Sequence, residues 1–299
     1  MKVSIIVVNY NTLQVTSECI RSVFDMTVGV SFEFILVDNA SKDGSREYFS
    51  QDKRIKYIYI DENLGFGRAN NLGIKEAKGD YILFLNPDTI LLNNAIKIMA
   101  DYLDYNQDVG ACGGNLYDAK MNPVISFERC FPSICSEINL MTKGYLYKLI
   151  YGKNYKFNHT GKPFDVAYIV GADLMMRRSL TDKIGGFDSH FFMYFEEVEL
   201  CYRIKKQKFS IHSVPSAEIQ HLEGVSTKSS NWIDSLIRNE TLRLQGRKTY
   251  YELTHTPAYH KIANLIRLMY LYSRILIVKD KDALRILRST LNRFRELYS

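Results

Sequence analysis

The sequence predicts an α/β fold in which a mixed, mainly parallel sheet is flanked by helices. Short runs rich in β-branched and aromatic residues alternate with segments whose apolar residues recur every three or four positions. The strand-like runs lie at residues 3–8, 32–37, 55–60 and 81–85, and the helix-like segments lie at 14–24, 66–77 and 93–105. Because parallel strands need crossover connections, this alternation indicates a sheet covered by helices on both faces.

After residue 113 the alternation is less regular. The stretch 115–161 is rich in Tyr, Lys and Asn, and we interpret it as an excursion from the main sheet. The regular signals return with a strand over 164–170, a Gly185-Gly186 turn, a helix over 195–206 and a strand over 209–214. We therefore expect the α/β domain to occupy residues 1–230.

The positive charge of the chain is concentrated near its end. The 299 residues carry a formal net charge of +6, and the segment from Arg238 onward holds 13 Lys/Arg against 5 Asp/Glu. Apolar residues recur there at helical spacing between the basic ones, which predicts a basic amphipathic helical extension over residues 231–299. Such an extension can bind an anionic membrane surface. A helical lid on the catalytic domain and a dimer contact are the alternatives, so the oligomeric state stays open, and we expect no nucleic-acid partner.

Cysteine usage and hydropathy favour a cytoplasmic protein. The five cysteines are scattered and show no CxxC spacing, so neither a disulfide framework nor a zinc ribbon is indicated. The apolar run at residues 5–8 is too short for a signal-peptide core, and the sequence has no run of about 18 apolar residues. We expect a peripheral position on the cytoplasmic face of the inner membrane, through the basic extension.

Polar side chains follow the predicted strands at the edge where open α/β sheets bind their ligands. Tyr10 follows the first strand and offers a flat aromatic ring. Asp38 lies at the end of the second strand, where its carboxylate can accept a hydrogen bond from a nucleobase N–H or a ribose hydroxyl. Asp88 follows the fourth strand, where a metal ion between its carboxylate and a diphosphate would neutralise leaving-group charge. Each segment is also compatible with an ordinary turn or helix cap.

The segment 63–71 follows the third predicted strand. Its glycines permit close approach of the backbone to a ligand, and Arg68 can face a diphosphate. The glycine spacing and the position after the third strand do not match a dinucleotide-binding fingerprint.

Three carboxylates occupy the first turn of the helix predicted over 195–206. Two interpretations fit them equally well. The carboxylates serve only to interact favourably with the helix dipole, or one of them, Glu197, is a general base whose pKa is raised by the neighbouring like charges. His221 falls in the polar stretch after the strand predicted over 209–214, and a lone histidine is more often without a ligand role.

In this order, the segments resemble the inverting nucleotide-sugar transferases of glycosyltransferase family 2, which have the GT-A fold, and within them the rhamnosyltransferase-like branch. The resemblance runs from residue 3 to about residue 226. It rests on Val-Val-Asn-Tyr-Asn, Asp-Asn-Ala-Ser-Lys-Asp-Gly-Ser, Asn-Leu-Gly-Phe-Gly-Arg-Ala-Asn-Asn, Leu-Asn-Pro-Asp, Gly-Gly-Phe-Asp, Phe-Glu-Glu-Val-Glu-Leu-Cys-Tyr-Arg and a later His.

The resemblance implies roles for individual residues. Glu197 would be the catalytic base with Glu196 as its support, and Asp88 with His221 would hold a divalent cation, Mg²⁺ or Mn²⁺. The nucleotide-sugar site would comprise Val8, Asn9, Tyr10, Asp38, Asn63, Gly65, Arg68, Asn70, Asn86 and Asp88. Two residues depart from the family pattern, because Asn86 replaces a carboxylate of the Asp-x-Asp metal motif and Glu197 replaces the usual Asp.

The resulting hypothesis is an inverting transferase that moves a sugar from a nucleotide diphosphate donor to a hydroxyl of a glycan or lipid-linked glycan in cell-surface polysaccharide synthesis. The resemblance favours dTDP-rhamnose as the donor. The alternative is a non-catalytic nucleotide-sugar-binding or scaffold subunit of a polysaccharide assembly complex. A nucleotidyltransferase would need a Gly-rich triphosphate loop near the N-terminus, and the sequence has none there.

Overall fold

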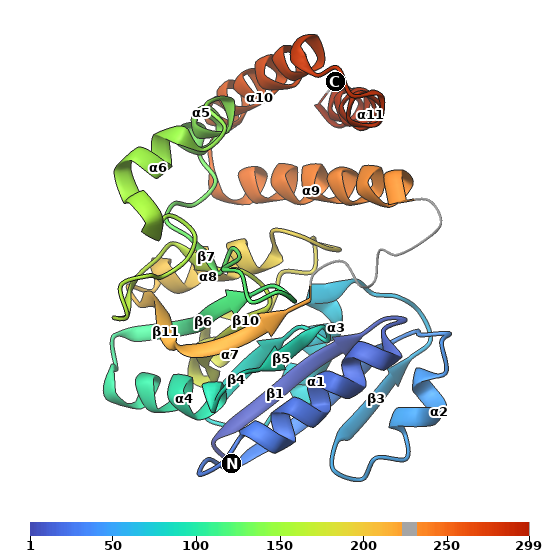
Figure 1. Ribbon diagram of the computed structural model, residues 1–299, viewed down its shortest axis with the longest axis vertical. Coiled ribbons are helices and arrows are strands. Elements are labelled where there is room, and N and C mark those ends of the chain that lie inside the picture. Colours follow the sequence, from blue (N-terminus) through green and yellow to red (C-terminus); the bar gives the residue numbers. More distant parts are fainter. Residues whose placement is uncertain (223–231, 299) are drawn as a thin grey trace.

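The computed structural model describes residues 1–222 and 232–298, and a mixed nine-stranded sheet forms its centre (Figure 1). The strands are β1 (Val3–Asn9), β2 (Phe32–Asn39), β3 (Lys56–Ile60), β4 (Tyr81–Leu85), β5 (Thr89–Leu91), β6 (Val109–Tyr117), β8 (Phe164–Asp165), β10 (Asp173–Arg177) and β11 (Ser210–His221). Their order is β3-β2-β1-β4-β10-β6-β11-β5, with β8 paired to β11. The first four strands are parallel, and β10 runs antiparallel between β4 and β6.

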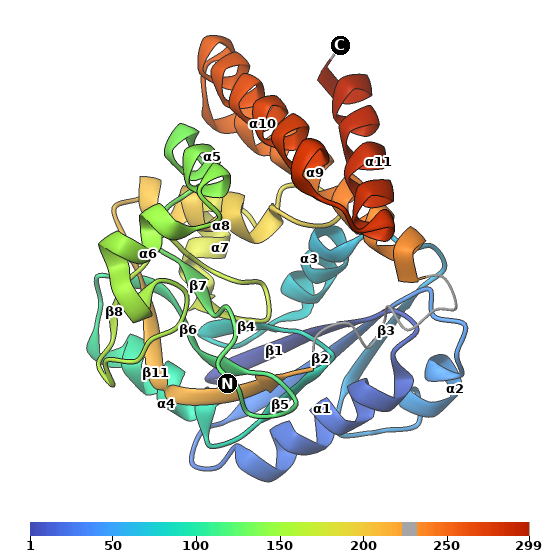
Figure 2. The same cartoon turned by 45° about the horizontal axis from the view of Figure 1, so that its top comes forward.

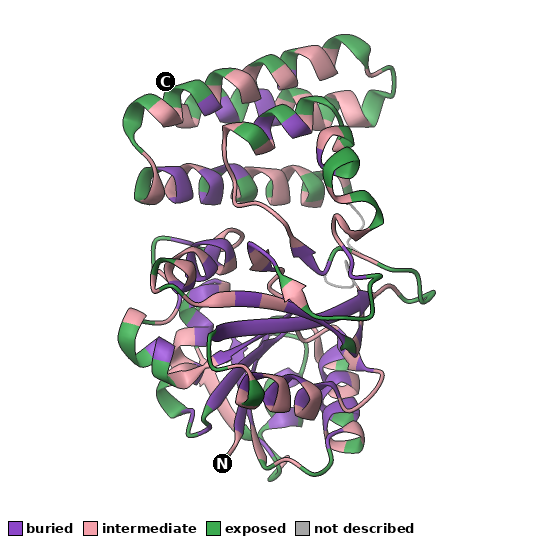
Figure 3. Ribbon diagram, turned by 90° about the vertical axis from the view of Figure 1, so that its left-hand side faces the viewer, coloured by how far each residue is buried: buried purple, intermediate pink, exposed green. Residues whose placement is uncertain are grey.

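Helices cover both faces of this sheet, as the sequence predicts. The first face carries α1 (Leu13–Met26) and α4 (Ala95–Tyr105), and the second carries α3 (Phe66–Glu76), α7 (Arg178–Ile184) and α8 (Glu196–Lys206). Because successive side chains of a strand point to opposite faces, Ile5 and Val7 pack toward the first face, and Ile6 and Val8 toward the second. Every residue of β1 is buried, and Figure 3 shows the buried strands between more exposed helices. The short helix α2 (Ser45–Phe49) lies between β2 and β3 in the chain.

Two predicted strands differ from the structure. The strand predicted over 164–170 is two strands, since β8 pairs with β11 in the main sheet whereas β9 (Tyr168–Ile169) pairs with β7 (Phe127–Glu128) in a separate two-stranded sheet. The strand predicted to end at residue 214 continues as β11 to His221. A register shift between Ser213 and Glu218, around Pro215, interrupts the alternating pattern of apolar residues there. The second half of the strand therefore could not be predicted from this pattern.

The excursion predicted over 115–161 begins inside β6 and then leaves the main sheet. It forms β7, α5 (Ile134–Met141), α6 (Tyr145–Tyr151) and a 3₁₀ turn over Gly152–Asn154. Helix α5 packs against the C-terminal helix α10 (Pro257–Ile277), so the excursion joins the main domain to the end of the chain.

Three helices follow residue 231: α9 (Trp232–Thr254), α10 and α11 (Lys281–Tyr298). Figure 1 shows α9 between the sheet and the other two helices, and Figure 2 shows them from another side. Tyr250 and Tyr251 of α9 pack with Phe191 and Val198 of the α/β part. None of the helices in residues 1–222 and 232–298 is both long and apolar enough to cross a membrane.

Candidate active site

A cavity of about 420 Å³ opens at the carboxyl ends of β1, β2 and β4. This is the edge at which the sequence places the ligand site. Eight of the predicted site residues line it: Val8, Tyr10, Asn63, Asn86, Asp88, Glu196, Glu197 and His221. The fold therefore brings side chains that are up to 213 positions apart in the chain, Val8 and His221, to one cavity.

The other predicted donor-site residues surround the cavity without lining it. The Asn9 side chain is buried, donates to Ser41 Oγ at 3.0 Å and accepts from Thr12 Oγ1 at 2.7 Å. The Asp38 carboxylate accepts from the Ser41 backbone N–H at 2.9 Å and from the Tyr57 hydroxyl at 2.7 Å. These bonds shape the loop after β1 and the end of β2, so both side chains act here as internal supports.

Three residues of the segment 63–71 also lie outside the cavity lining. Gly65 has a φ of 83°, and a Cβ there would lie 2.2 Å from the Phe192 carbonyl oxygen, so no larger residue fits. Asn70 is buried and donates to the Phe66 carbonyl. From the sequence we expect Arg68 to face a diphosphate. In the structure its Nε and Nη2 instead donate to the Ser189 carbonyl, at 2.9 and 2.7 Å. The structure therefore does not bring this guanidinium to the cavity.

Asp88, His221 and Asn86 form a polar cluster in the cavity. His221 Nε2 lies 3.3 Å from Asp88 Oδ1 and 3.3 Å from Asn86 Nδ2. Backbone bonds fix the cluster, since Asn86 N–H donates to the Ala172 carbonyl and Leu222 N–H to that of Asp88. His221 is the last residue of β11 and is not beyond the strand, and this pairing places it opposite Thr89 of β5. Within the described residues no three His, Cys, Asp or Glu side chains gather to hold a metal by themselves.

Glu196 and Glu197 begin α8 and face the same cavity. Burial raises the pKa of both carboxyl groups, and the charge of Glu197 raises that of Glu196 further. Backbone N–H groups at the helix start oppose the shift, but desolvation outweighs them. The Oε2 atom of each has no hydrogen-bond partner among the described residues, and Gly171 lies against Glu197 without a side chain between them. Buried carboxyls with a free oxygen and a raised pKa are suited to proton transfer.

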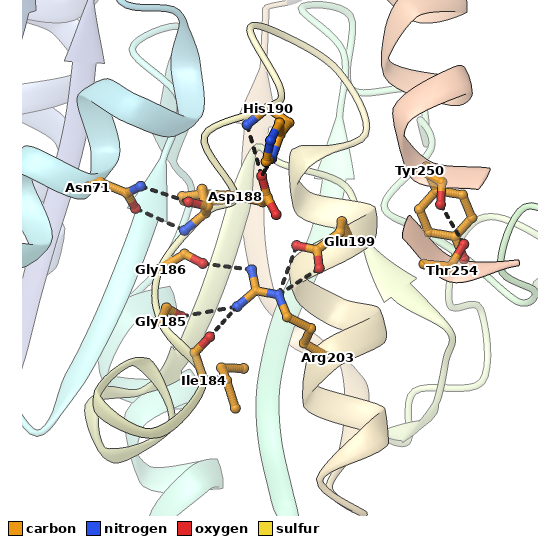
Figure 4. A network of polar contacts seen from close by, with 11 residues as sticks. Asn71, Ile184, Gly185, Gly186, Asp188, His190, Glu199, Arg203, Tyr250 and Thr254 are labelled. Carbon is orange, nitrogen blue, oxygen red and sulfur yellow. Dashed lines mark hydrogen bonds and ion pairs between the residues drawn. The ribbon is translucent and has the colours of Figure 1, made fainter. Parts of the chain in front are cut away.

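A hydrogen-bonded frame fixes the loop that leads into α8 (Figure 4). Arg203 donates to the carbonyl groups of Ile184 and Gly186 at 2.6 Å each, and the Glu199 carboxylate holds its Nε. Asn71 of α3 accepts from the Phe187 N–H and donates to the Phe187 carbonyl. The Gly185-Gly186 turn predicted from sequence is thus tied to two helices.

Sequence reasoning missed several residues of the site. Asn39 lines the cavity, where its amide donates to Asn63 Oδ1 at 2.9 Å and accepts from the Leu64 N–H. Ile125 of the excursion, the segment 170–172, and Met193 with Tyr194 complete much of the wall. A sequence signal existed for both Asn39 and Tyr194, because Asn39 follows Asp38 and Tyr194 lies two residues before Glu196. The contribution of Ile125 depends on tertiary folding alone.

The architecture is the GT-A fold. The crystal structure of GalNAc-T7 with UDP, GalNAc and Mn²⁺ is similar with a TM-score of 0.62 at 14% identity, covering 99% of this chain and 56% of that one. The mannosyltransferase PcManGT from Pyrobaculum calidifontis, in complex with GDP-Man and Mn²⁺, gives 0.55 at 14% identity, covering 99% and 85%. At such identities the likeness concerns the fold.

The model of glycosyl transferase family 2 matches residues 4–198, and the chain belongs to this family. The low-salt glycan biosynthesis hexosyltransferase Agl10 of Haloferax volcanii is 29% identical over 226 residues, 74% of this chain and 67% of that protein. The N-acetylglucosaminyl-diphospho-decaprenol L-rhamnosyltransferase of Mycobacterium tuberculosis is 28% identical over 216 residues, 64% of this chain and 67% of that protein. Glycosyltransferase GlyG of Streptococcus pneumoniae is 32% identical over 120 residues, 39% of each chain. The protein is a glycosyltransferase.

Proposed function

We propose that this glycosyltransferase moves rhamnose from dTDP-rhamnose, with inversion, to a hydroxyl of a glycan or lipid-linked glycan in the synthesis of cell-surface polysaccharide. One observation carries the proposal: the buried pair Glu196 and Glu197 shares a single cavity with Asp88 and His221. A proton acceptor and a pair of metal-binding side chains in one hollow can serve one displacement at an anomeric carbon.

Glu197 is the proposed general base. It takes the proton of the acceptor hydroxyl while that oxygen attacks the anomeric carbon from the face opposite the nucleoside diphosphate. One displacement inverts the configuration and forms no covalent enzyme intermediate. Glu196 supports the base as a neighbouring carboxyl whose protonated form is favoured, because burial and the charge of Glu197 both raise its pKa.

Asp88 and His221 would hold a divalent cation in this proposal. One carboxylate and one imidazole leave room for diphosphate oxygens, and carboxylate ligands suit Mn²⁺ and Mg²⁺. The 3.3 Å between Asp88 Oδ1 and His221 Nε2 lets both atoms face one ion, so the residues present fit the group. When bound, the cation neutralises charge on the departing diphosphate. Mn²⁺ is named with both similar GT-A structures, which supports this assignment.

The donor assignment rests on residues at the strand ends and on one relative. In this proposal Tyr10, which is 40% exposed and lines the cavity, lies against the nucleobase, with Val8 and Asn63 beside it. The Mycobacterium tuberculosis relative transfers L-rhamnose to a diphospho-decaprenol acceptor, which supports rhamnose as the sugar.

The C-terminal helices form the second part of the proposal. We assign residues 1–230 to the catalytic domain and 231–299 to a basic extension that holds the enzyme on the cytoplasmic face of the inner membrane. Each basic residue close to an anionic surface contributes about 1 kcal/mol. Flotation with anionic liposomes should show association at low salt that weakens at high salt. No association at low salt removes the membrane role and leaves the helices as a lid or a contact between copies.

Binding and product analysis test the donor and the chemistry. Calorimetry with Mn²⁺ should show tighter binding of dTDP than of UDP or GDP, and NMR of the product should show the anomeric configuration opposite to that of the donor. A strong preference for UDP or GDP would remove dTDP-rhamnose. Donor binding without transfer to any acceptor would instead favour the non-catalytic subunit.

A further inference from the structure

A second cavity, of about 510 Å³, lies between the excursion and the C-terminal helices. Residues of α5 and the turn after it form one side, and residues of α9 and α10 form the other. Five cationic side chains and two carboxylates line it: Lys143, Lys156, Arg247, Arg267 and Arg274, with Glu128 and Glu137. The cavity is therefore positively charged overall.

The two carboxylates of this cavity are already paired. Glu137 lies 2.8 Å from Arg247 Nε and 2.6 Å from Arg267 Nε, and Glu128 lies 2.8 Å from Lys156 Nζ. Lys143 and Arg274 make no ion pair with any residue in the described parts of the chain. They are available to an anion from outside.

Arg247 adds a second sign of a missing partner. Its side chain is 2% exposed, and Nη1 donates to Asn264 and to the Tyr298 hydroxyl. Nη2 is buried and has no hydrogen-bond partner among the described residues. An unmade bond on a buried guanidinium is costly, and an anion held in this cavity would offset it.

The second cavity adjoins the active site through two short pieces of chain. Tyr168 and Phe195 line it, whereas Val170 and Glu196 line the first cavity. At about 3.3 Å per residue of extended chain, these positions lie within roughly 7 Å of each other along the backbone. The two cavities therefore share a stretch of wall that ends at the proposed base.

The helices that form this cavity also expose apolar side chains. On the excursion these are Met141, Tyr145, Leu149 and Ile150, and on α10 they are Met269, Leu276 and Ile277. Helices that combine a basic cavity with exposed apolar residues match a charged head group followed by a hydrocarbon chain.

Resting on the proposed function, we propose that this second cavity binds the phosphate or diphosphate of a lipid-linked acceptor. The acceptor sugar then lies between the anion and Glu197, and the hydrocarbon chain packs on exposed apolar side chains of α5, α6 and α10. Lys143, Arg274 and Arg247 Nη2 are the groups that hold the phosphate oxygens.

The first test is calorimetry in excess EDTA with inorganic pyrophosphate and with farnesyl diphosphate. The wild type should bind both, farnesyl diphosphate at least tenfold more tightly. The double variant Lys143→Gln/Arg274→Gln should bind each at least tenfold more weakly. The matched control Lys279→Gln/Arg288→Gln removes the same charge from exposed positions and should bind like the wild type. Equal weakening in both double variants, or no binding by the wild type, overturns the site, and equal affinity for the two probes overturns the lipid.

A second measurement separates this inference from the proposed function. Binding of dTDP with Mn²⁺ should be unchanged in Lys143→Gln/Arg274→Gln, because those residues do not line the first cavity. Loss of dTDP binding in that variant would contradict a separate acceptor site. A wild type that binds farnesyl diphosphate but no nucleoside diphosphate would defeat the proposed function and leave the anion site intact.

Discussion

Gly246 of α9 lies against the backbone of Tyr194, at the entrance to the helix that carries the two site carboxylates. A Cβ at position 246 would be 2.4 Å from the Tyr194 carbonyl oxygen. Tyr194 and Phe195 have φ values of 69° and 72°, a region that costs a non-glycine residue on the order of 1–3 kcal/mol. The next residue is Glu196. Helix α9 therefore braces a strained turn that sets the position of both carboxylates.

Gly246→Ala should lower the rate of transfer by up to roughly 10²-fold, the scale of loss that a misplacement of 1 Å can produce. In an open helix this change stabilises by about 1 kcal/mol, but the contact with a backbone atom forces α9 and the turn apart. Donor binding should change little. The measurements are kcat, donor Kd and Tm, with the exposed neighbour Gln245→Ala as control. A raised Tm with wild-type kcat would mean that the turn does not depend on α9.

Glu197→Gln should reduce transfer by roughly 10²-fold or more, because the amide keeps the shape of the side chain but cannot accept the proton. Donor affinity should stay near that of the wild type, since the base faces the acceptor. Steady-state rates and calorimetric Kd values for Glu197→Gln and Glu196→Gln decide the roles. An active Glu197→Gln beside an inactive Glu196→Gln reverses the assignment, and activity in both contradicts the mechanism.

The transfer rate should fall on acidification at a pH above the usual carboxyl range. Burial raises the pKa of Glu197 above its ordinary value of 4.5, so protonation inactivates the base at a higher pH than for an exposed carboxyl. Glu196→Gln should leave this acid limb in place, because burial and not the charge of Glu196 raises the pKa of Glu197. A pH profile of kcat for both proteins is the measurement. An acid limb at or below 4.5 in the wild type would show that the base is solvated during catalysis.

Local patterns predicted the α/β part of the fold well. The strand predicted over 81–85 is β4, and the helix predicted over 195–206 is α8 within one residue, because both patterns depend on neighbours in the chain. The Arg68 contact could not be predicted, since Ser189 lies 121 residues away. The second cavity could not be predicted either, because it forms only where α5, α9 and α10 pack together. The polar residues at strand ends could be predicted from the sequence, whereas contacts between distant loops could not.

Chelation should weaken donor binding. Asp88 and His221 are the cavity side chains assigned to a cation, and Arg68 is engaged with Ser189, so little positive charge remains near a diphosphate. Excess EDTA should therefore raise the Kd for dTDP by at least tenfold, and Asp88→Asn should do the same with Mn²⁺ present. Calorimetry measures both, and Ile125→Ala, in the wall of the same cavity, tests whether any cavity substitution has this effect. Equal affinity with and without EDTA would exclude the metal role.

The buried contact of Glu137 with Arg247 and Arg267 should make stability depend on pH. Coulombic attraction from both guanidinium groups holds the pKa of Glu137 below its ordinary value of 4.5 although burial opposes this. A depressed folded-state pKa means that the stabilisation is present above about 4.5 and is lost as the pH falls through the folded-state value. Glu137→Gln leaves two cations without their buried partner, so it should cost about 3–5 kcal/mol at pH 7. Urea unfolding between pH 7 and pH 3 measures both effects. The difference between wild type and Glu137→Gln should shrink on acidification, and a difference that stays constant with pH would mean that the carboxylate charge does not stabilise the packing of α5 on α9 and α10.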